Sequence, residues 1–151
     1  MIEACDDAAR RRWMSVLALA PTEELETAWS ALPERPAYRL VRSPEMGLVM
    51  VRARAGGSGT RFNLGEMTVS RCTVALPSGA VGQAYVRGRR PRHAELAAVF
   101  DGLLQDPASR PGLEVRLVGP LETAERERRV ALRGRSEPTR VEFFTLVRGE
   151  D

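Results

Sequence analysis

The stretch Met46-Gly47-Leu48-Val49-Met50-Val51-Arg52-Ala53-Arg54 decides the fold. It begins with an almost continuous apolar run, which is typical of a strand that is covered on both faces and lies in the centre of a sheet. The segment Gly56-Gly57-Ser58-Gly59 follows and permits a reversal of the chain. We therefore expect this strand to open a series of antiparallel hairpins.

Two more segments complete the predicted meander. Residues 66–76 return after the glycine turn, Pro77-Ser78-Gly79 reverses the chain again, and residues 80–87 form the next strand. Residues 38–42, 113–118 and 141–147 also have strand character. The last of these contains Phe143 and Phe144. Because a terminus frays unless it is tied down, we expect this closing strand to pair with something.

Three segments repeat apolar residues at the helical spacing i, i+3, i+4 and i+7. They contain Trp13, Val16, Leu17 and Ala20; Leu25, Ala28, Trp29 and Leu32; and Leu96, Val99, Phe100 and Leu103. Each stripe needs a covering surface, and we expect a neighbouring subunit to supply it. Trp13 and Trp29 are interpreted as anchors in the core or in an interface.

A fourth helix is predicted from Pro120 to the region before Pro138, with charged residues spaced for i,i+4 ion pairs. Strands clustered between helices at hairpin distances favour the α+β class. The prediction is a single domain over residues 1–151. It has a mainly antiparallel sheet of four to five strands, two N-terminal helices and two later helices.

The composition is that of a globular protein. The chain has 151 residues, of which 43% are hydrophobic and 28% charged. No apolar run approaches the roughly 20 residues that span a bilayer, and the first residues are acidic rather than basic as in a secretory signal. Two cysteines are too few for a disulfide framework or a cysteine metal site. These features predict a cytoplasmic protein that does not bind a membrane.

Positive charge is concentrated in the middle of the chain. Residues 37–92 contain ten arginines and two glutamates, a net charge of +8, whereas the flanking segments are net acidic. Such a field suits a phosphate-rich ligand or an acidic partner surface, but it also suits a solvated sheet face. A nucleic-acid-binding module is a third reading, with thin support because only 5% of the residues are aromatic.

The glycine turn has two interpretations. It lacks the lysine and the following helix of a P-loop, so a hairpin turn is the simpler one. The alternative is a phosphate site in which backbone amides of Gly56, Gly57 and Gly59 act together with Arg54 and Arg61.

His93 is the single histidine and follows several arginines. Neighbouring positive charge disfavours its protonation, and we expect a neutral side chain with a structural or anion-contacting role rather than a general base. Cys72, in the middle of a strand, is expected to be a small buried side chain. No catalytic triad, carboxylate pair or metal cluster emerges from the sequence.

Several stretches, in a fixed order, resemble one family, the G subunit of the bacterial carbon–phosphorus lyase core complex. Residues 10–18 are similar to its opening helix, and residues 56–62 to its glycine turn. Leu64-Gly65-Glu66 follows, with Thr68, Ser70, Arg71 and Cys72. Gly88-Arg89 with His93-Ala94-Glu95 resembles its strand-to-helix junction, Pro120-Leu121 precedes its charged helix, and residues 141–151 resemble its carboxyl-terminal signature.

This resemblance implies a role in the use of phosphonates as a phosphorus source. It implies a synthase step in which methylphosphonate displaces adenine from ATP and yields ribose 1-methylphosphonate 5-triphosphate. The implied partners are the H, I, J, K and L subunits, and the I subunit, which carries the nucleosidase-like chemistry, is the closest of them. The iron–sulfur cluster and S-adenosylmethionine would belong to the J subunit, since this chain has no cysteine cluster and needs no cofactor.

On this basis we expect an accessory subunit that contributes no catalytic residue and binds no nucleic acid. The candidate interface residues are Trp13, Trp29, Phe143, Phe144 and Arg148. The alternative is direct contact with ATP phosphates or phosphonate. Its candidates are Arg54, Gly56, Gly57, Gly59, Arg61, Arg87, Arg89 and His93.

Overall fold

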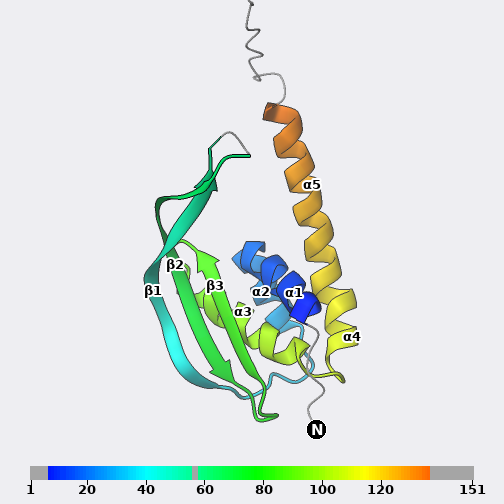
Figure 1. The fold of residues 1–151 in the computed structure, drawn as a ribbon. Coiled ribbons are helices and arrows are strands. Elements are labelled where there is room, and N and C mark those ends of the chain that lie inside the picture. Colours follow the sequence, from blue (N-terminus) through cyan, green and yellow to red (C-terminus); the bar gives the residue numbers. More distant parts are fainter. Residues whose placement is uncertain (1–6, 56–57, 137–151) are drawn as a thin grey trace, which may run out of the picture.

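The structure, a computed structural model, describes residues 7–55 and 58–136 (Figure 1). Its elements are α1 (Asp7–Leu19), α2 (Thr22–Ser30), β1 (Arg39–Arg54), β2 (Arg61–Ala75), β3 (Val81–Arg87), α3 (Pro91–Leu104), α4 (Arg110–Leu113), a π-helical turn η1 (Glu114–Val118) and α5 (Gly119–Ser136). The last three are continuous. The α+β class is therefore confirmed, with two helices before the sheet and two helical segments after it.

The strands form an antiparallel sheet in the order β1-β2-β3. The described residues contain three strands, not the predicted four to five. Residues 38–42 merge with the strand that follows them into one long β1, and the expected strand at residues 141–147 lies outside the described residues. Both predicted hairpins are confirmed, since β1 pairs with β2 and β2 with β3.

The predicted strand at residues 113–118 is wrong. Leu113, Leu117 and Leu121 are buried at intervals of four residues, which is the period of a helix, whereas Val115 is exposed. Pro120 has no amide hydrogen, and its ring would crowd a carbonyl one turn earlier in a regular helix. The wider π turn just before Pro120 provides the space for the ring, so the helix continues through this residue.

The central position predicted for residues 46–51 is also wrong. β1 is an edge strand whose only neighbour in the described sheet is β2. Met46, Leu48 and Met50 are 57%, 63% and 53% exposed. Pro44 lies within β1, close to an irregularity in the register between Arg42 and Glu45, and proline in a sheet is typical of an edge strand or a bulge.

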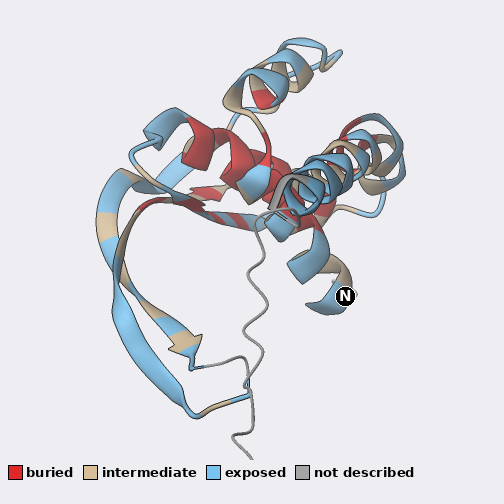
Figure 2. Ribbon diagram, turned by 90° about the horizontal axis from the view of Figure 1, so that it is seen from above, coloured by how far each residue is buried: buried red, intermediate tan, exposed pale blue. Residues whose placement is uncertain are grey.

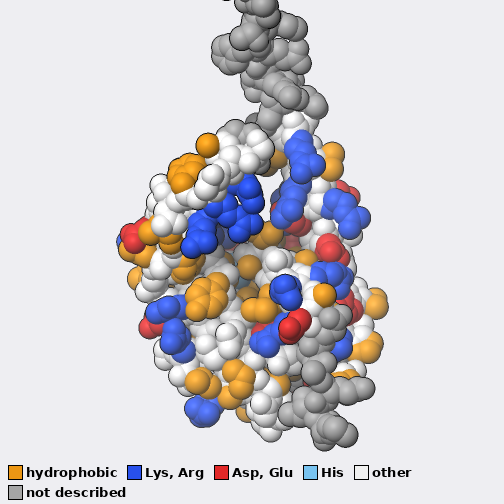
Figure 3. Space-filling model, viewed as in Figure 1, with side chains coloured by type: hydrophobic (Ala, Val, Ile, Leu, Met, Phe, Trp, Pro, Cys, Tyr) orange, Lys and Arg blue, Asp and Glu red, His pale blue; other side chains and the backbone are white. Residues whose placement is uncertain are grey.

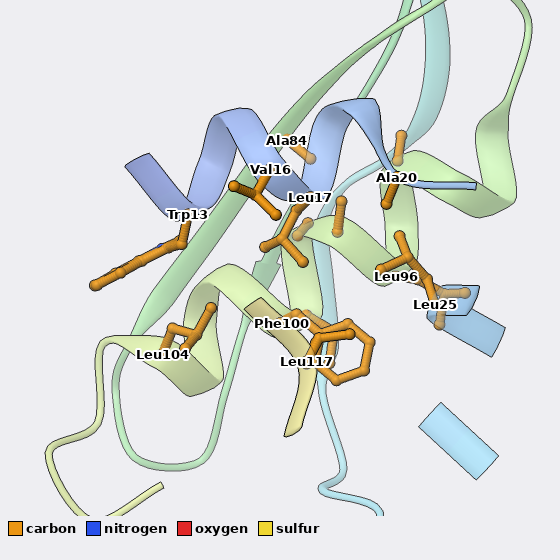
Figure 4. Packing of buried hydrophobic residues seen from close by; sticks show 14 of the residues in the cluster. Trp13, Val16, Leu17, Ala20, Leu25, Ala84, Leu96, Phe100, Leu104 and Leu117 are labelled. Atoms are coloured by element: carbon orange, nitrogen blue, oxygen red, sulfur yellow. The ribbon is translucent and has the colours of Figure 1, made fainter. Parts of the chain in front are cut away.

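The core lies between α1, α3 and one face of the β2–β3 half of the sheet. Trp13, Leu17, Leu96 and Phe100 are completely or almost completely buried there (Figure 4). The helical stripes read from the sequence are therefore real. The chain's own sheet and helices cover those of α1 and α3, so the expectation that another subunit covers them is wrong for these two helices. Of the α2 stripe only Leu25 is buried, and Ala28, Trp29 and Leu32 are partly buried. Figure 2 shows that burial is concentrated in this region and that the far part of the β1–β2 hairpin is exposed.

The carboxylate of Asp101 on α3 is completely buried and joins three elements. It accepts hydrogen bonds from Arg10 Nη2 on α1 at 2.7 Å, from Trp13 Nε1 at 2.9 Å and from the backbone amide of Gln83 on β3 at 2.9 Å. The first of these is also an ion pair. Because these donors satisfy the buried charge, α1 is held at a defined position against β3 and α3.

Gly82 on β3 permits the close approach of α3. A Cβ atom at this position would overlap the backbone carbonyl oxygen of Ala98 and the backbone nitrogen of Gly102. Neither backbone atom moves without displacing the helix. The packing of α3 on the sheet therefore requires glycine at this position.

We expect Gly82→Ala to lower the free energy of unfolding by about 3 kcal/mol, because the added methyl group pushes α3 from the sheet. The matched control is Gly65→Ala, in β2, where an added Cβ meets no atom within 4 Å. It should change the free energy of unfolding by no more than about 0.5 kcal/mol. Urea denaturation of the two variants measures the difference, and equal effects would contradict the assigned packing.

Candidate protein-interaction surface

The arginines named from the sequence fall into two separate groups. Arg54 and Arg61 face each other at the end of the β1–β2 hairpin, and Arg54 Nη1 donates to the carbonyl oxygen of Gly59 at 3.3 Å. Arg87 ends β3, where it lies opposite Val69 of β2, and Arg89 lies in the turn before α3. Val69 and Arg61 are eight residues apart on β2, roughly 25 Å along an extended strand. The fold therefore does not gather these arginines into one site through the sheet.

No carboxylate of the described residues forms an ion pair with Arg54, Arg61, Arg87 or Arg89. Arg42, Arg71 and Arg92, by contrast, are bound by Glu45, Glu26 or Glu95. Figure 3 shows basic side chains gathered below the tip of the hairpin. Each of the two groups is thus positively charged without a counter-charge among the described residues, which favours an anionic or acidic partner.

Gly59 closes the hairpin turn through a hydrogen bond from its amide to the carbonyl oxygen of Ala55, at 2.9 Å. This amide is therefore already used within the turn. Gly56 and Gly57, the other members of the candidate phosphate cradle, lie outside the described residues.

His93 is buried in the core near the start of α3. Its Nε2 lies 2.8 Å from the carbonyl oxygen of Leu17, so this nitrogen carries the proton and donates, and its Nδ1 lies 3.3 Å from the hydroxyl of Thr22. Burial lowers the pKa of His93, and the charge of Arg90 lowers it further, while the bond to Leu17 opposes both effects. The side chain is neutral and links α1, α2 and α3, and it offers no surface to an anion.

The two tryptophans have different environments. Trp13 is completely buried. Trp29 is half-buried and forms an edge-to-face contact with Tyr38, with ring centroids 6.0 Å apart, and the guanidinium of Arg35 lies 5.9 Å from its ring centroid. Trp13 is thus a core residue, whereas Trp29 retains some accessible surface. Phe143, Phe144 and Arg148 lie outside the described residues.

The described residues contain no group of three or more histidine, cysteine or acidic side chains suited to a metal ion. Burial raises the pKa of Cys72 to about 11, so its thiol remains protonated at neutral pH. A groove of about 610 Å³ lies between the segment after α2 and the region of α3 to η1, and its lining is mainly aliphatic. No helix of the described residues is both long and apolar enough to cross a bilayer.

Sequence reasoning missed an uncovered apolar surface formed by Met46, Leu48 and Met50 on β1. On α5, every residue from Arg126 to Gly134 is exposed, including Val130 and Leu132 at 65% and 67%. These two residues are two positions apart in a helix and lie on different faces, so they form no apolar patch. Figure 1 shows that the hairpin and α5 both project beyond the rest of the fold. A contiguous apolar stripe such as the one on β1 marks a site of protein contact.

These features define the class of the protein: a small α+β protein with an exposed apolar surface suited to protein contact and with basic residues at the end of its hairpin. A family model described as "Phosphonate metabolism protein PhnG" matches residues 8–149. A similar protein is the alpha-D-ribose 1-methylphosphonate 5-triphosphate synthase subunit PhnG of Rhizobium meliloti (strain 1021). The identity is 45% over 147 residues, which cover 95% of this chain and 92% of that protein. The chain belongs to the PhnG family, and the resemblance read from the sequence is confirmed.

The buried histidine predicts a pH dependence of stability. In the unfolded chain His93 binds a proton below about pH 6.5. The folded chain does not bind it until a lower pH, because the folded pKa is depressed. The unfolded state therefore binds more protons below pH 6.5, and stability falls with decreasing pH by up to about 1.4 kcal/mol per unit.

We expect His93→Gln to abolish this slope between pH 7.5 and 5.5. The depressed carboxylates Glu26 and Glu122 have ordinary pKa values of 4.5, so they lose their stabilising effect only at lower pH. Urea denaturation at three pH values measures the slope in both proteins. Equal slopes would show that His93 is accessible to protons in the folded state.

Proposed function

We propose that this chain is a subunit of an alpha-D-ribose 1-methylphosphonate 5-triphosphate synthase within the carbon–phosphorus lyase complex, and that it contributes no catalytic residue. The observation that carries the proposal is the 45% identity to a protein of that name over 95% of the chain. The arrangement of the described residues supports the accessory role. His93 is buried, the Cys72 thiol is protonated, and the basic residues lie in two separate groups.

The proposed partner is the I subunit, to which the nucleosidase-like chemistry on ATP and methylphosphonate is assigned. The uncovered surface for such a contact is the β1–β2 hairpin, with its exposed Met46, Leu48 and Met50, and not the buried apolar stripes of α1 and α3. The H, J, K and L subunits belong to the same proposed system. An iron–sulfur cluster and S-adenosylmethionine would act on the J subunit.

We expect the chain to co-purify with the I subunit when the two are co-expressed, and synthase activity to require its presence among the subunits. Alone, it should self-associate or precipitate, since the exposed apolar residues of β1 and α5 then face water. Product formation from ATP and methylphosphonate, with and without this chain, is the decisive measurement. Full synthase activity in the absence of this chain would refute the proposal. So would an isolated chain that is a monodisperse monomer and does not bind the I subunit.

A second candidate function is direct contact with substrate phosphates at the end of the hairpin. It is favoured by Arg54 and Arg61, which lie directly opposite each other without a carboxylate partner among the described residues. Like charges at such positions destabilise a strand pair, and a bound triphosphate or phosphonate would neutralise them.

If the hairpin arginines bind substrate, Arg54→Ala in the assembled complex should raise KM for ATP at least about tenfold, as expected for loss of a charged hydrogen bond. Arg89→Ala tests the other basic group separately. Arg39→Ala, at the opposite end of β1, is the matched control. Unchanged kinetics in both Arg54→Ala and Arg89→Ala, with assembly intact, would leave the accessory role as the only function of this surface.

A further inference from the structure

One face of β1 carries an exposed apolar stripe that leads into positive charge. Met46, Leu48, Met50, Arg52 and Arg54 alternate with less exposed residues, so they share one face of the strand. Across the hairpin, Met46 lies opposite Ser70 and Arg54 opposite Arg61. We call these five residues of β1 the hairpin stripe.

The hairpin stripe begins on the side of the sheet that the helices cover. Ser70, opposite Met46, is buried. Its hydroxyl donates a hydrogen bond to the carbonyl oxygen of Gly88 at 2.8 Å and accepts one from the backbone amide of Arg90 at 2.7 Å, both in the turn that leads to α3. Beyond this position the hairpin extends past α1, α2 and α3 (Figures 1 and 2), and Met46, Leu48 and Met50 are more than half exposed in the described chain.

The outer edge of the β1 main chain has no strand partner among the described residues. β1 is the edge of the described sheet over its whole length, and Pro44 and the nearby irregularity in the register blunt only its first part. Residues 46–51 contain neither proline nor charge, which are the usual means by which a monomer protects an edge strand from pairing. A free edge beside an apolar stripe is the geometry that accepts an added strand.

The charge at the far end of the stripe restricts the partner further. Arg52, Arg54 and Arg61 cluster there, and none of them has an ion-pair partner in the described residues. Glu66, opposite Met50, is the one acidic side chain among the cross-strand partners of the stripe. A partner segment that is apolar along residues 46–50 and acidic next to Arg52 and Arg54 would cover the apolar residues and neutralise the arginines.

We propose that the hairpin stripe is the docking site for an extended segment of a partner subunit, which adds to the edge of β1. The segment places apolar side chains on Met46, Leu48 and Met50, and acidic side chains on Arg52, Arg54 and Arg61. This assignment rests on the proposed function, since it names the surface through which the chain joins its synthase. The proposed strand addition is possible at the hairpin but not at α5. The exposed Val130 and Leu132 of α5 lie on a helix, which has no free main-chain edge.

The test is the affinity of the full-length chain for the I subunit. Leu48→Glu should weaken binding at least about tenfold, because it introduces a charge into the apolar part of the contact and repels an acidic segment. Leu132→Glu is the matched control, since the same substitution is made at a residue of similar exposure, 67% against 63%. It should bind as the wild type does. Both side chains are exposed, so the melting temperatures should also match that of the wild type.

Two further readouts separate the parts of the proposal. The double variant Arg52→Ala/Arg54→Ala should bind about tenfold more weakly at low salt, and the deficit should shrink near 0.5 M salt, where surface charges are screened. Amide hydrogen exchange in peptides covering residues 46–54 should slow when the I subunit binds, because the free edge of β1 becomes paired.

Each adverse outcome has its own meaning. If the wild-type chain does not bind the I subunit, the proposed function fails. If the wild type binds but Leu48→Glu binds equally well, or Leu132→Glu is the damaging change, the docking site is wrong while the function stands. If the isolated chain forms dimers that Leu48→Glu dissociates, and binding of the I subunit is unaffected, the occupant of the stripe is a second copy and the proposal is overturned.

Discussion

The buried carboxylate of Asp101 is the contact on which the arrangement of the helices depends. A charge in a protein interior is unfavourable unless donors surround it, and here the donors come from α1 and β3 while the carboxylate belongs to α3. Satisfying this one group therefore fixes three elements that are far apart in the sequence. Gly82 lies next to Gln83, one of these donors, and lets α3 approach the same strand closely. His93 links α1 and α2 to the beginning of α3.

This arrangement concentrates burial in one half of the sheet. The helices cover β3 and the adjoining part of β2, and the apolar stripes of α1 and α3 are buried by this packing. The far part of the β1–β2 hairpin and the second half of α5 then have no cover within the described chain. The same packing that satisfies the helices thus leaves the apolar residues of β1 and the hairpin arginines for another molecule, as suits a subunit of a larger assembly.

Much of the fold could be predicted from local patterns. Trp13, Leu17, Leu96 and Phe100 lie in the core as their helical spacing indicates, and the turn at residues 77–79 joins two strands as predicted. The wrong predictions come from sequence patterns that fit two different secondary structures or two positions in a sheet. Leu113, Leu117 and Leu121 have the spacing of a helix, yet the intervening apolar residues gave the impression of a strand. Pro44 was the available sign that β1 is an edge strand.

The sequence by itself determined the family, the α+β class, the helical stripes and the excess of arginine in the middle of the chain, because these depend on residue type and short-range spacing. Only the tertiary structure decided that His93 is buried, that Arg54 and Arg61 lie far along β2 from Arg87, and that Met46, Leu48 and Met50 of the apolar run are exposed. The physical reason is that burial is a property of neighbours. An apolar strand has the same sequence pattern whether its own chain or another subunit covers it.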